Sequence, residues 1–428
     1  MKSRHIATMI AVLAAAAGLF AFHRYLEGHT AEREPAGIEA PERAERAVPT
    51  LDDTALTPGP EAEPAPDTVA GRPTPGTLGL SLQNEVDAAI ERGLDWLAAH
   101  QREDGSWSNP RFPALTALSA KAFIHSAHPE RDRVVDRALD YILSCVQDDG
   151  GIYQEVEGRR GGGLSNYNTA ISMMALHAAD RPDLTPYVLN ARTFIARMQH
   201  FGDDSYSGGF GYDRDTDRAY ADLLNTYWSV VAMRETAAAE EARPPQEGRV
   251  DIDWAETVAF IEKMQNPAAA GTDQEGGFFY RPGESKAGAT TNEAGVVYFR
   301  SYGSMTYAGM LSLIYADVDR QDARVRSAFD WAARHWTLAE NPGMGDEGLF
   351  YFYNVLTKCL DALDVDAVPR VGNDGVINWR KEMAGRLVSR QHIDPATGHG
   401  YWKNDDGRFW ESDPVLTTAY SLLALHML

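Results

Sequence analysis

Two groups of carboxylate residues stand just before long apolar stretches, where a loop leads into a helix. Asp213, Asp215 and Asp217 form the string DRDTD, and Glu411 and Asp413 precede the last apolar stretch of the chain. Paired carboxylates act as general acid and base, and their oxygens also bind Mg²⁺ or Ca²⁺ loosely. Asp213, Asp215 and Asp413 are therefore catalytic candidates. The plainer interpretation is that these loop carboxylates are solvated or form local hydrogen bonds.

Aromatic residues recur at or near the start of the same apolar stretches. Rings gathered at the mouth of a pocket favour an apolar ligand, such as an isoprenoid, or stack against sugar rings. Aromatic residues at helical spacing also serve as core packing, and this alternative stays open. The predicted ligand-binding residues are Tyr167, Tyr212, Asn225, Tyr227, Tyr302, Tyr307, Tyr351, Tyr353 and Trp402.

A repeated unit has to position all of these residues. Its first copy, GLDWLAAHQREDGSW at residues 93–107, combines an amphipathic helix ending near a Gln, an acidic Gly turn and an aromatic residue, and a second helix follows it. Because one such unit cannot bury its own apolar face, neighbouring units must stack. Further copies occur at residues 138–153, 191–212, 257–280, 328–353 and 383–402.

The second helix of each unit differs from the first in its apolar pattern. Segments such as NYNTAISMMALHAA at residues 166–179 are apolar nearly all round, which indicates burial on both sides. We therefore predict an all-α fold, an (α/α)6 toroid of six helical hairpins with the second helices as its inner ring. The Gly turns predict positive φ angles at Gly209 and Gly277.

The repeat also carries a family resemblance. Trp96, Gln101, Asp104, Gly105 and Trp107 resemble the QW repeat of squalene and hopene cyclases. The region from about residue 80 to the C-terminus is similar to the prenyltransferase and squalene oxidase repeat superfamily, and within it to a poorly characterised bacterial branch. The resemblance implies the toroid fold, and it implies that the repeat glutamines stack on an aromatic residue of the neighbouring unit.

The catalytic motifs of that superfamily do not carry over to this sequence. Neither the DxDD of protonating cyclases nor the DDxxD of ionising synthases occurs. In the zinc site of protein prenyltransferases an Asp stands two residues before a Cys, but here Thr357 precedes Cys359, and Leu416 stands near the place of the His. A thioester CGEQ run is also absent. We therefore predict no metal site and no cofactor, apart from loosely bound magnesium or calcium.

Composition and the N-terminal sequence suggest where the protein works. A formal net charge of −22 disfavours nucleic acid as a partner, and Cys145 and Cys359 have neither zinc nor disulfide spacing. Residues 1–26 read as a signal peptide or a single-span membrane anchor, residues 27–79 as a disordered Pro/Glu/Ala-rich linker, and residues 80–428 as the toroid. These features predict a protein on the non-cytoplasmic side of the cell envelope, either membrane-anchored or secreted.

Three functions fit this sequence. The first is a terpenoid cyclase- or prenyltransferase-like protein that binds an isoprenoid, a lipid or another apolar small molecule in the toroid mouth, with or without catalysis. The second is a carbohydrate-active (α/α)6 enzyme, which would need two carboxyl groups about 5 to 9.5 Å apart across a cleft. The third is a non-catalytic envelope scaffold. The sequence does not indicate an oligomeric state.

Overall fold

A computed structural model of the chain describes residues 78–156, 163–213, 219–268, 273–372 and 375–428, which all belong to the segment Gly71–Leu428. The predicted N-terminal segment 1–26 and all but the last two residues of the predicted linker 27–79 lie outside them. No helix in the described ranges has both the length and the apolar composition needed to cross a membrane.

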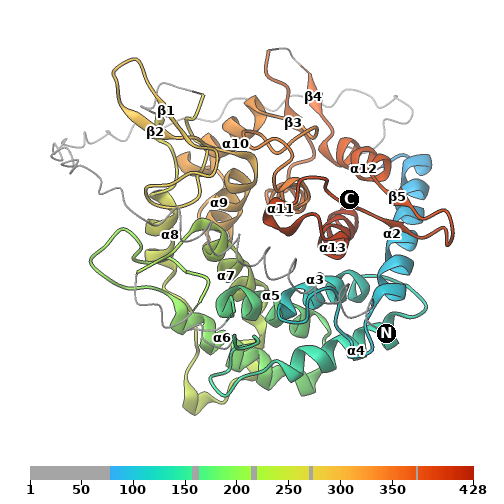
Figure 1. The fold of residues 1–428 in the computed structure, drawn as a ribbon. Coiled ribbons are helices and arrows are strands. Elements are labelled where there is room, and N and C mark those ends of the chain that lie inside the picture. The colour runs from blue at the N-terminus through green and yellow to red at the C-terminus, as the bar shows by residue number, and fades with distance from the viewer. Residues whose placement is uncertain (1–77, 157–162, 214–218, 269–272, 373–374) are drawn as a thin grey trace, which may run out of the picture. The chain divides into compact units, whose positions relative to one another are not determined.

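The helices that the sequence predicts to be apolar all round form an inner ring (Figure 1). Each inner helix packs against the next, and the last packs against the first, so the ring closes. Burial extends around these helices: in α3, every residue from Pro113 to Phe123 is buried. The inner helices are α3 (Pro113–Ile124), α5 (Ser165–Ala178), α7 (Leu223–Glu235), α9 (Gly303–Tyr315), α11 (Leu349–Ala362) and α13 (Pro414–Leu425).

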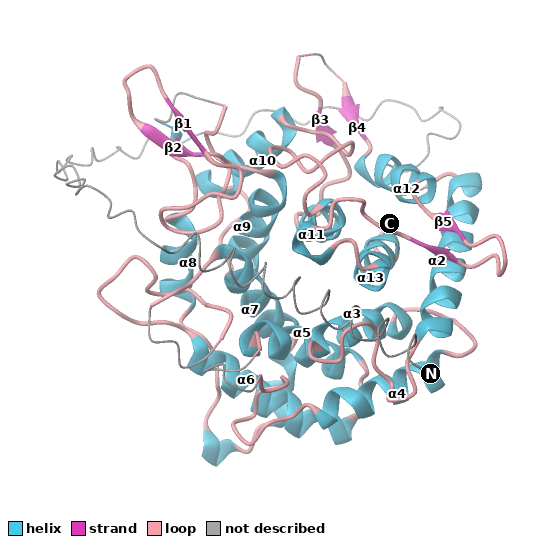
Figure 2. Ribbon diagram, viewed as in Figure 1, coloured by secondary structure: helices cyan, strands magenta, loops and turns pink. Residues whose placement is uncertain are grey.

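The amphipathic helices form an outer layer around this ring, and the predicted toroid class is confirmed (Figure 2). Their apolar faces pack on the inner helices, while their polar faces point outward. The outer helices are α2 (Leu80–His100), α4 (Arg131–Ser144), α6 (Thr185–Met198), α8 (Trp254–Glu262), α10 (Ala323–Arg334) and α12 (Trp379–Ser389). Short 3-10 helices occupy some of the loops: η1 (Pro182–Leu184), η2 (Ala237–Ala242), η3 (Pro245–Glu247) and η5 (Arg408–Trp410).

The all-α prediction needs one small correction, because three loops contain short antiparallel hairpins. Each hairpin has only two strands and lies between an outer and an inner helix in the chain, so it leaves the toroid unchanged. The pairs are β1 (Ala289–Thr291) with β2 (Val297–Phe299), β3 (Val368–Pro369) with β4 (Val376–Ile377), and β5 (His392–Ile393) with β6 (Gly400–Tyr401).

A threonine on the inner helix fastens the turn of each of five repeats. Its hydroxyl accepts a hydrogen bond from the backbone N–H of the first large residue after the Gly turn, at 2.8 to 3.2 Å. This bond satisfies a buried donor and fixes the turn against its own inner helix. The donor and acceptor pairs are Trp107 with Thr116, Ile152 with Thr169, Phe210 with Thr226, Phe278 with Thr306, and Trp402 with Thr418.

Four repeat glutamines join consecutive outer helices through hydrogen bonds to the backbone, whereas Gln147 donates to carbonyls of its own unit. The Gln101 amide donates to the Val134 carbonyl of α4 at 2.9 Å, and Gln199 and Gln265 make equivalent bonds to the next unit. Gln391 donates to the Ala89 carbonyl of α2 at 2.8 Å, which ties the last outer helix to the first. The resemblance implied that the glutamines stack on an aromatic residue of the neighbouring unit. These four glutamines instead donate hydrogen bonds to the backbone of that unit.

The Gly turns have the predicted backbone strain, but one residue earlier than expected. Positive φ angles occur at Gly208 (+90°) and Gly276 (+83°), so the prediction for Gly209 and Gly277 is wrong. A Cβ on Gly208 would lie 2.0 Å from the Glu256 carbonyl oxygen. The first glycine of each pair therefore supplies the left-handed turn and the close approach to the next outer helix.

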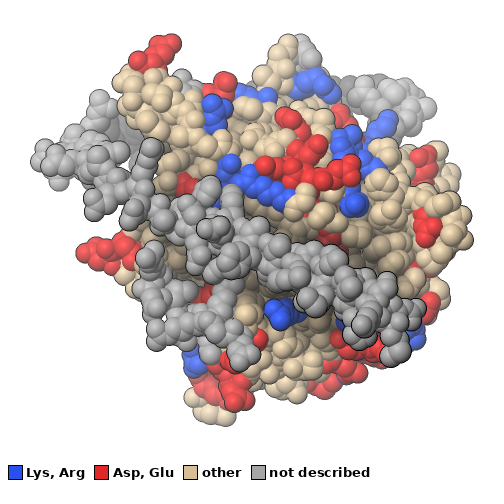
Figure 3. All heavy atoms as spheres, in the orientation of Figure 1, with Lys and Arg blue, Asp and Glu red and all other residues tan. Residues whose placement is uncertain are grey.

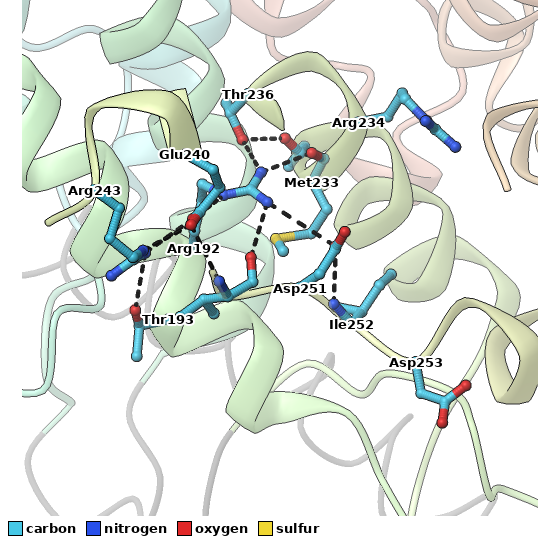
Figure 4. Close-up of polar contacts among 12 residues, drawn as sticks. Arg192, Thr193, Met233, Arg234, Thr236, Glu240, Arg243, Asp251, Ile252 and Asp253 are labelled. Carbon is cyan, nitrogen blue, oxygen red and sulfur yellow. Dashed lines mark hydrogen bonds and ion pairs between the residues drawn. The ribbon is translucent and has the colours of Figure 1, made fainter. Parts of the chain in front are cut away.

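A buried ion cluster fastens the segment after α7 to helix α6 (Figure 4). The Arg192 guanidinium donates to Glu240 Oε1 at 2.7 Å, to the Met233 carbonyl at 2.7 Å and to the Thr236 hydroxyl at 2.8 Å. Arg243 donates to the second carboxylate oxygen of Glu240 at 2.7 Å. Burial alone would raise the pKa of Glu240, but the bonds from Arg243 and Arg192 outweigh it and hold that pKa near 2.

Candidate functional site at the inner-helix N-termini

The N-termini of the inner helices gather at one end of the ring, where those of α3, α5, α9 and α11 are bound by a side chain from the next unit and those of α7 and α13 by their own N-cap Asp. Free N–H groups at a helix start carry partial positive charge and attract oxygen acceptors. The Ser165 N–H at the start of α5 donates to Asp213 at 3.1 Å, and the Ser304 N–H of α9 donates to Asn341 at 2.9 Å. This end of the ring is therefore rich in carboxylate and amide groups.

The predicted catalytic carboxylates have structural partners here. Asp213 caps α5 as described, and Asp413 is the N-cap of α13, where it accepts from the Val415 N–H at 2.9 Å and from the Ser108 hydroxyl. Asp215 lies outside the described residues. Asp213 and Asp413 sit in loops that enter different inner helices, and each holds a helix terminus.

Glu411 is a more deeply buried carboxyl in the same end of the ring. It accepts hydrogen bonds from the N–H groups of Phe350 and Tyr351 at the start of α11 and from the Asn404 amide, at 2.7 to 3.1 Å. Burial raises its pKa to about 7, although these three donors favour the charged form. Glu411 thus links the loop before α13 to the N-terminus of α11.

Asp222 is the buried carboxyl that the sequence interpretation missed. Its carboxylate accepts from the Asn225 N–H and side-chain amide, both at 2.8 Å, and from the Tyr280 hydroxyl at 3.1 Å. Tyr280 in turn contacts the hydroxyl groups of Tyr220 at 2.8 Å and Tyr212 at 3.4 Å. Burial raises the pKa of Asp222, while the donors from Asn225 and Tyr280 oppose the rise. The sequence signal was an Asp directly before an apolar helix, which is typical of an N-cap.

Aromatic side chains cross the middle of the inner ring. Tyr227 and Trp228 of α7 lie with ring centroids 6.3 Å from that of Tyr351 on α11, although α9 separates these helices in the ring. Tyr167 of α5 reaches across α3 to Tyr420 of α13, with the two hydroxyl oxygens 3.5 Å apart. We call Tyr167, Tyr227, Trp228, Tyr351 and Tyr420 the axial aromatic layer. The layer lies in the first two turns of these helices.

Several polar atoms of this region are buried without a partner. Among the described residues, six buried side-chain polar atoms lack a hydrogen bond, and four belong to Asn225, Tyr227, Trp228 and Tyr351. The exposed fractions of these four residues are between 0 and 9%. A buried polar atom without a partner costs about 1–3 kcal/mol, so four in one region need an explanation.

The other predicted ligand-binding residues divide into two sets. Tyr302 is buried at the N-cap of α9, where burial and then the charge of Asp222 raise its pKa, so it belongs to the site. Tyr307 packs against Phe352, with centroids 5.9 Å apart. Tyr353 and Trp402 face the outer layer, since they donate to the carbonyls of Leu338 and Leu387 respectively.

The basic side chains at the rim of this end are paired with acidic ones. Arg281 and Lys286 both pair with Glu284, and Arg408 pairs with Glu347. In the part of the face that Figure 3 shows free of grey atoms, a basic group near the centre likewise lies beside an acidic one.

The C-terminal end of the inner ring has a different chemistry. Lys121 of α3 and Lys358 of α11 both pair with Glu235 of α7, Lys121 at 2.9 Å. Burial alone would raise the pKa of Glu235, but the two lysines hold it well below its usual range. Ion pairs therefore bridge alternate inner helices at this end, whereas aromatic rings bridge them at the other.

The described ranges contain no group of three or more His, Cys, Asp or Glu residues that is arranged to hold a metal ion. Cys145 and Cys359 are both buried free thiols, and burial raises the pKa of each. Neither thiol is thereby activated as a nucleophile.

The concentric helix layers define the class of this protein, an α/α toroid. No protein-family model and no curated protein matches the chain. Among solved structures, the GH76A α-1,6-mannanase from Salegentibacter sp. HEL1_6 has a TM-score of 0.50 at 9% identity, covering 81% of this chain and 98% of that one. This likeness supports the fold alone.

Both protein classes named by the sequence resemblance are also structural neighbours. The type II terpene cyclase MstE from Scytonema has a TM-score of 0.48 at 11% identity, covering 81% of this chain and 99% of that one. The protein geranylgeranyltransferase-I of Candida albicans, with bound GGPP, has a TM-score of 0.49 at 14% identity, covering 79% and 89%.

Proposed function

We propose that this protein is a terpenoid cyclase- or prenyltransferase-like toroid of the cell envelope that binds an isoprenoid or another apolar ligand at the inner-helix N-termini. The observation that carries this proposal is the axial aromatic layer with its unpartnered polar atoms. Aromatic faces provide large apolar area, and the unpartnered atoms mark a place where a ligand supplies what the protein lacks. The same proposal includes two features of the chain: the toroid has six hairpin repeats, and the N-terminal segment is a membrane segment.

If the protein catalyses a reaction, Asp222 is the residue best placed to donate a proton. It is fully buried, its pKa is raised, and it lies beside Asn225 and Tyr280 on the mouth side of the aromatic layer. A raised pKa favours the protonated form of a carboxyl, which is the form that a general acid needs, whereas a solvated carboxyl loses its proton at lower pH. The Asp222→Asn variant would keep the cap but lose the acid.

A carbohydrate-active site is less favoured by the described carboxylates. Asp213 and Asp413 cap helices, Glu411 holds the start of α11, and Glu347 pairs with Arg408. A glycosidase needs two carboxyl groups facing each other across a cleft. These four described carboxylates instead hold the protein's own structure together.

The proposal can be tested by isolating the full chain from membranes and identifying any co-purified lipid by native mass spectrometry. Titration with geranylgeraniol, followed by calorimetry, should give saturable binding that Trp228→Ala weakens at least tenfold. Trp379→Ala is the matched control, because Trp379 is buried in the outer helix α12 and donates to the Val365 carbonyl. Absence of binding by every isoprenoid tested would overturn the proposal.

A further inference from the structure

We infer that the ligand of the axial aromatic layer carries an uncharged oxygen group, a hydroxyl or a carbonyl, and is neither a plain hydrocarbon nor a diphosphate. This inference rests on the proposed function and specifies its ligand. The observation behind it is the chemical identity of the four unpartnered atoms.

Those four atoms include both donors and an acceptor. The Trp228 indole N–H is a donor only, and the hydroxyls of Tyr227 and Tyr351 can donate or accept. The Asn225 amide nitrogen already donates to Asp222 at 2.8 Å, so the unpartnered Asn225 oxygen is an acceptor. A hydroxyl can both donate and accept, and a carbonyl can accept from the indole or from a tyrosine. Either group can complete hydrogen bonds that a hydrocarbon leaves unmade.

The side chains that carry these atoms are close neighbours. The centroids of the Tyr227 and Trp228 rings are 5.0 Å apart, and each lies 6.3 Å from the centroid of Tyr351. Burial chiefly raises the pKa of Tyr351, and the adjacent hydroxyls of Tyr227 and Tyr167 raise it further. These ring-centroid distances fit one compact polar group on the ligand.

The charges around the layer disfavour an anionic head group. In the described part of the chain, no basic side chain is hydrogen-bonded to any of these four residues, and Asn225 is bonded to the Asp222 carboxyl. An anion would therefore be buried without a cation and close to another acidic group, which is costly. Lys286, over the Tyr280 ring, and Arg281, over the Tyr220 ring, are both paired with Glu284.

The concentration of these atoms argues against a general packing defect. The remaining two unpartnered atoms in the described residues belong to Gln101, in the outer layer, and Ser172, on α5. Elsewhere in the interior, buried polar groups such as Arg192 and Glu240 are fully bonded. Hydrogen bonding is therefore incomplete mainly in the layer itself and at Asn225 beside it.

The test compares three ligands with the same carbon skeleton on the full chain: geranylgeraniol, the matching hydrocarbon and geranylgeranyl diphosphate. The affinity of each ligand is measured by how well it displaces a fluorescent isoprenoid probe from the protein. One or two recovered hydrogen bonds should make the alcohol bind about 10- to 100-fold more tightly than the hydrocarbon. The alcohol should also bind more tightly than the diphosphate. Tyr351→Phe should reduce the preference for the alcohol at least threefold, whereas Tyr353→Phe on the same helix should leave it unchanged.

Equal affinity for the alcohol and the hydrocarbon would overturn this inference. It would mean that water, and not the ligand, makes the hydrogen bonds of the four atoms. Tighter binding of the diphosphate would also overturn it. In both cases the proposed function would stand, since an isoprenoid binds. If none of the three ligands displaces the probe or binds directly by calorimetry, the proposed function itself fails, and the inference fails with it.

Discussion

Two buried polar regions of this protein differ in how completely their hydrogen bonds are made. In the cluster of Arg192, Glu240 and Arg243, the guanidinium and carboxylate groups all have partners at close distances (Figure 4). In and beside the axial aromatic layer, Trp228, Tyr351 and two neighbouring residues each have a buried polar atom without a hydrogen-bond partner. The first region shows how this fold buries polar groups that serve its stability. The second departs from that rule where the inner-helix N-termini meet, which suggests that it serves a ligand.

The largest expected effect is a loss of stability when the fully bonded cluster of Arg192, Glu240 and Arg243 is disrupted. Arg192→Ala removes bonds to Glu240, to Thr236 and to backbone carbonyls, and leaves Glu240 with only part of its compensating charge. We expect the free energy of unfolding to fall by about 3–5 kcal/mol, measured by chemical denaturation. Arg181→Ala is the control, because the ion pairs of Arg181 are exposed and should contribute less than about 1 kcal/mol. Similar losses in both variants would show that the buried cluster contributes no more to stability than an exposed ion pair.

Glu411 is an intermediate case, since it is buried and has three donors but its pKa is about 7. Its ordinary pKa of 4.5 applies in the unfolded chain, so between pH 4.5 and 7 the folded state binds more protons than the unfolded state. The stabilisation from this group is therefore complete below pH 4.5 and is lost as the pH rises through 7, a change of about 3 kcal/mol.

The measurement compares the free energy of unfolding of the protein with that of Glu411→Gln at several pH values from 4.5 to 8. The advantage of the unchanged protein over the variant should shrink as the pH rises. An advantage that grows with pH would show that the three N–H donors outweigh burial, and that Glu411 belongs with the fully bonded groups.

Tyr353→Phe should destabilise the protein. Its hydroxyl donates to the Leu338 carbonyl at 2.6 Å and accepts from Arg386 at 3.0 Å, so the phenylalanine leaves two groups without their partner. We expect a loss of about 1–2 kcal/mol in thermal or chemical unfolding. An unchanged stability would mean that this hydroxyl is not engaged as the structure shows.

Tyr351→Phe makes the same chemical change two residues earlier and should have the opposite sign. It removes a buried hydroxyl that has no partner, so the ligand-free protein should gain about 1 kcal/mol of unfolding free energy. Differential scanning calorimetry of the two variants side by side measures the contrast. A loss of stability in Tyr351→Phe would show that this hydroxyl is satisfied in the folded protein.

The helix layers were predictable from the sequence because burial on all sides leaves an all-apolar pattern in each inner helix. The roles of single residues were less predictable. Tyr351 and Tyr353 looked equivalent in the sequence, but side chains two positions apart on a helix point in very different directions, and only Tyr351 reaches the axis.

The carboxylates illustrate a second limit of the sequence. Asp213 and Asp222 both precede an apolar helix, and sequence alone does not separate a half-buried loop acid from a fully buried one. The partner that marks Asp222 as part of the site, Tyr280, lies 58 residues further along the chain. Such a contact depends on how neighbouring units stack and leaves no local pattern.

The bond from Gln391 to Ala89 joins positions 302 residues apart in the chain. Helix α13 likewise packs on both α2 and α3. An open array of repeats can gain stability one unit at a time during synthesis, but a closed ring lacks its final interfaces until the last hairpin has been made. The hairpin of α12 and α13 must therefore have emerged from the ribosome before this ring can close, and the surfaces of α2 and α3 that they cover stay exposed until then.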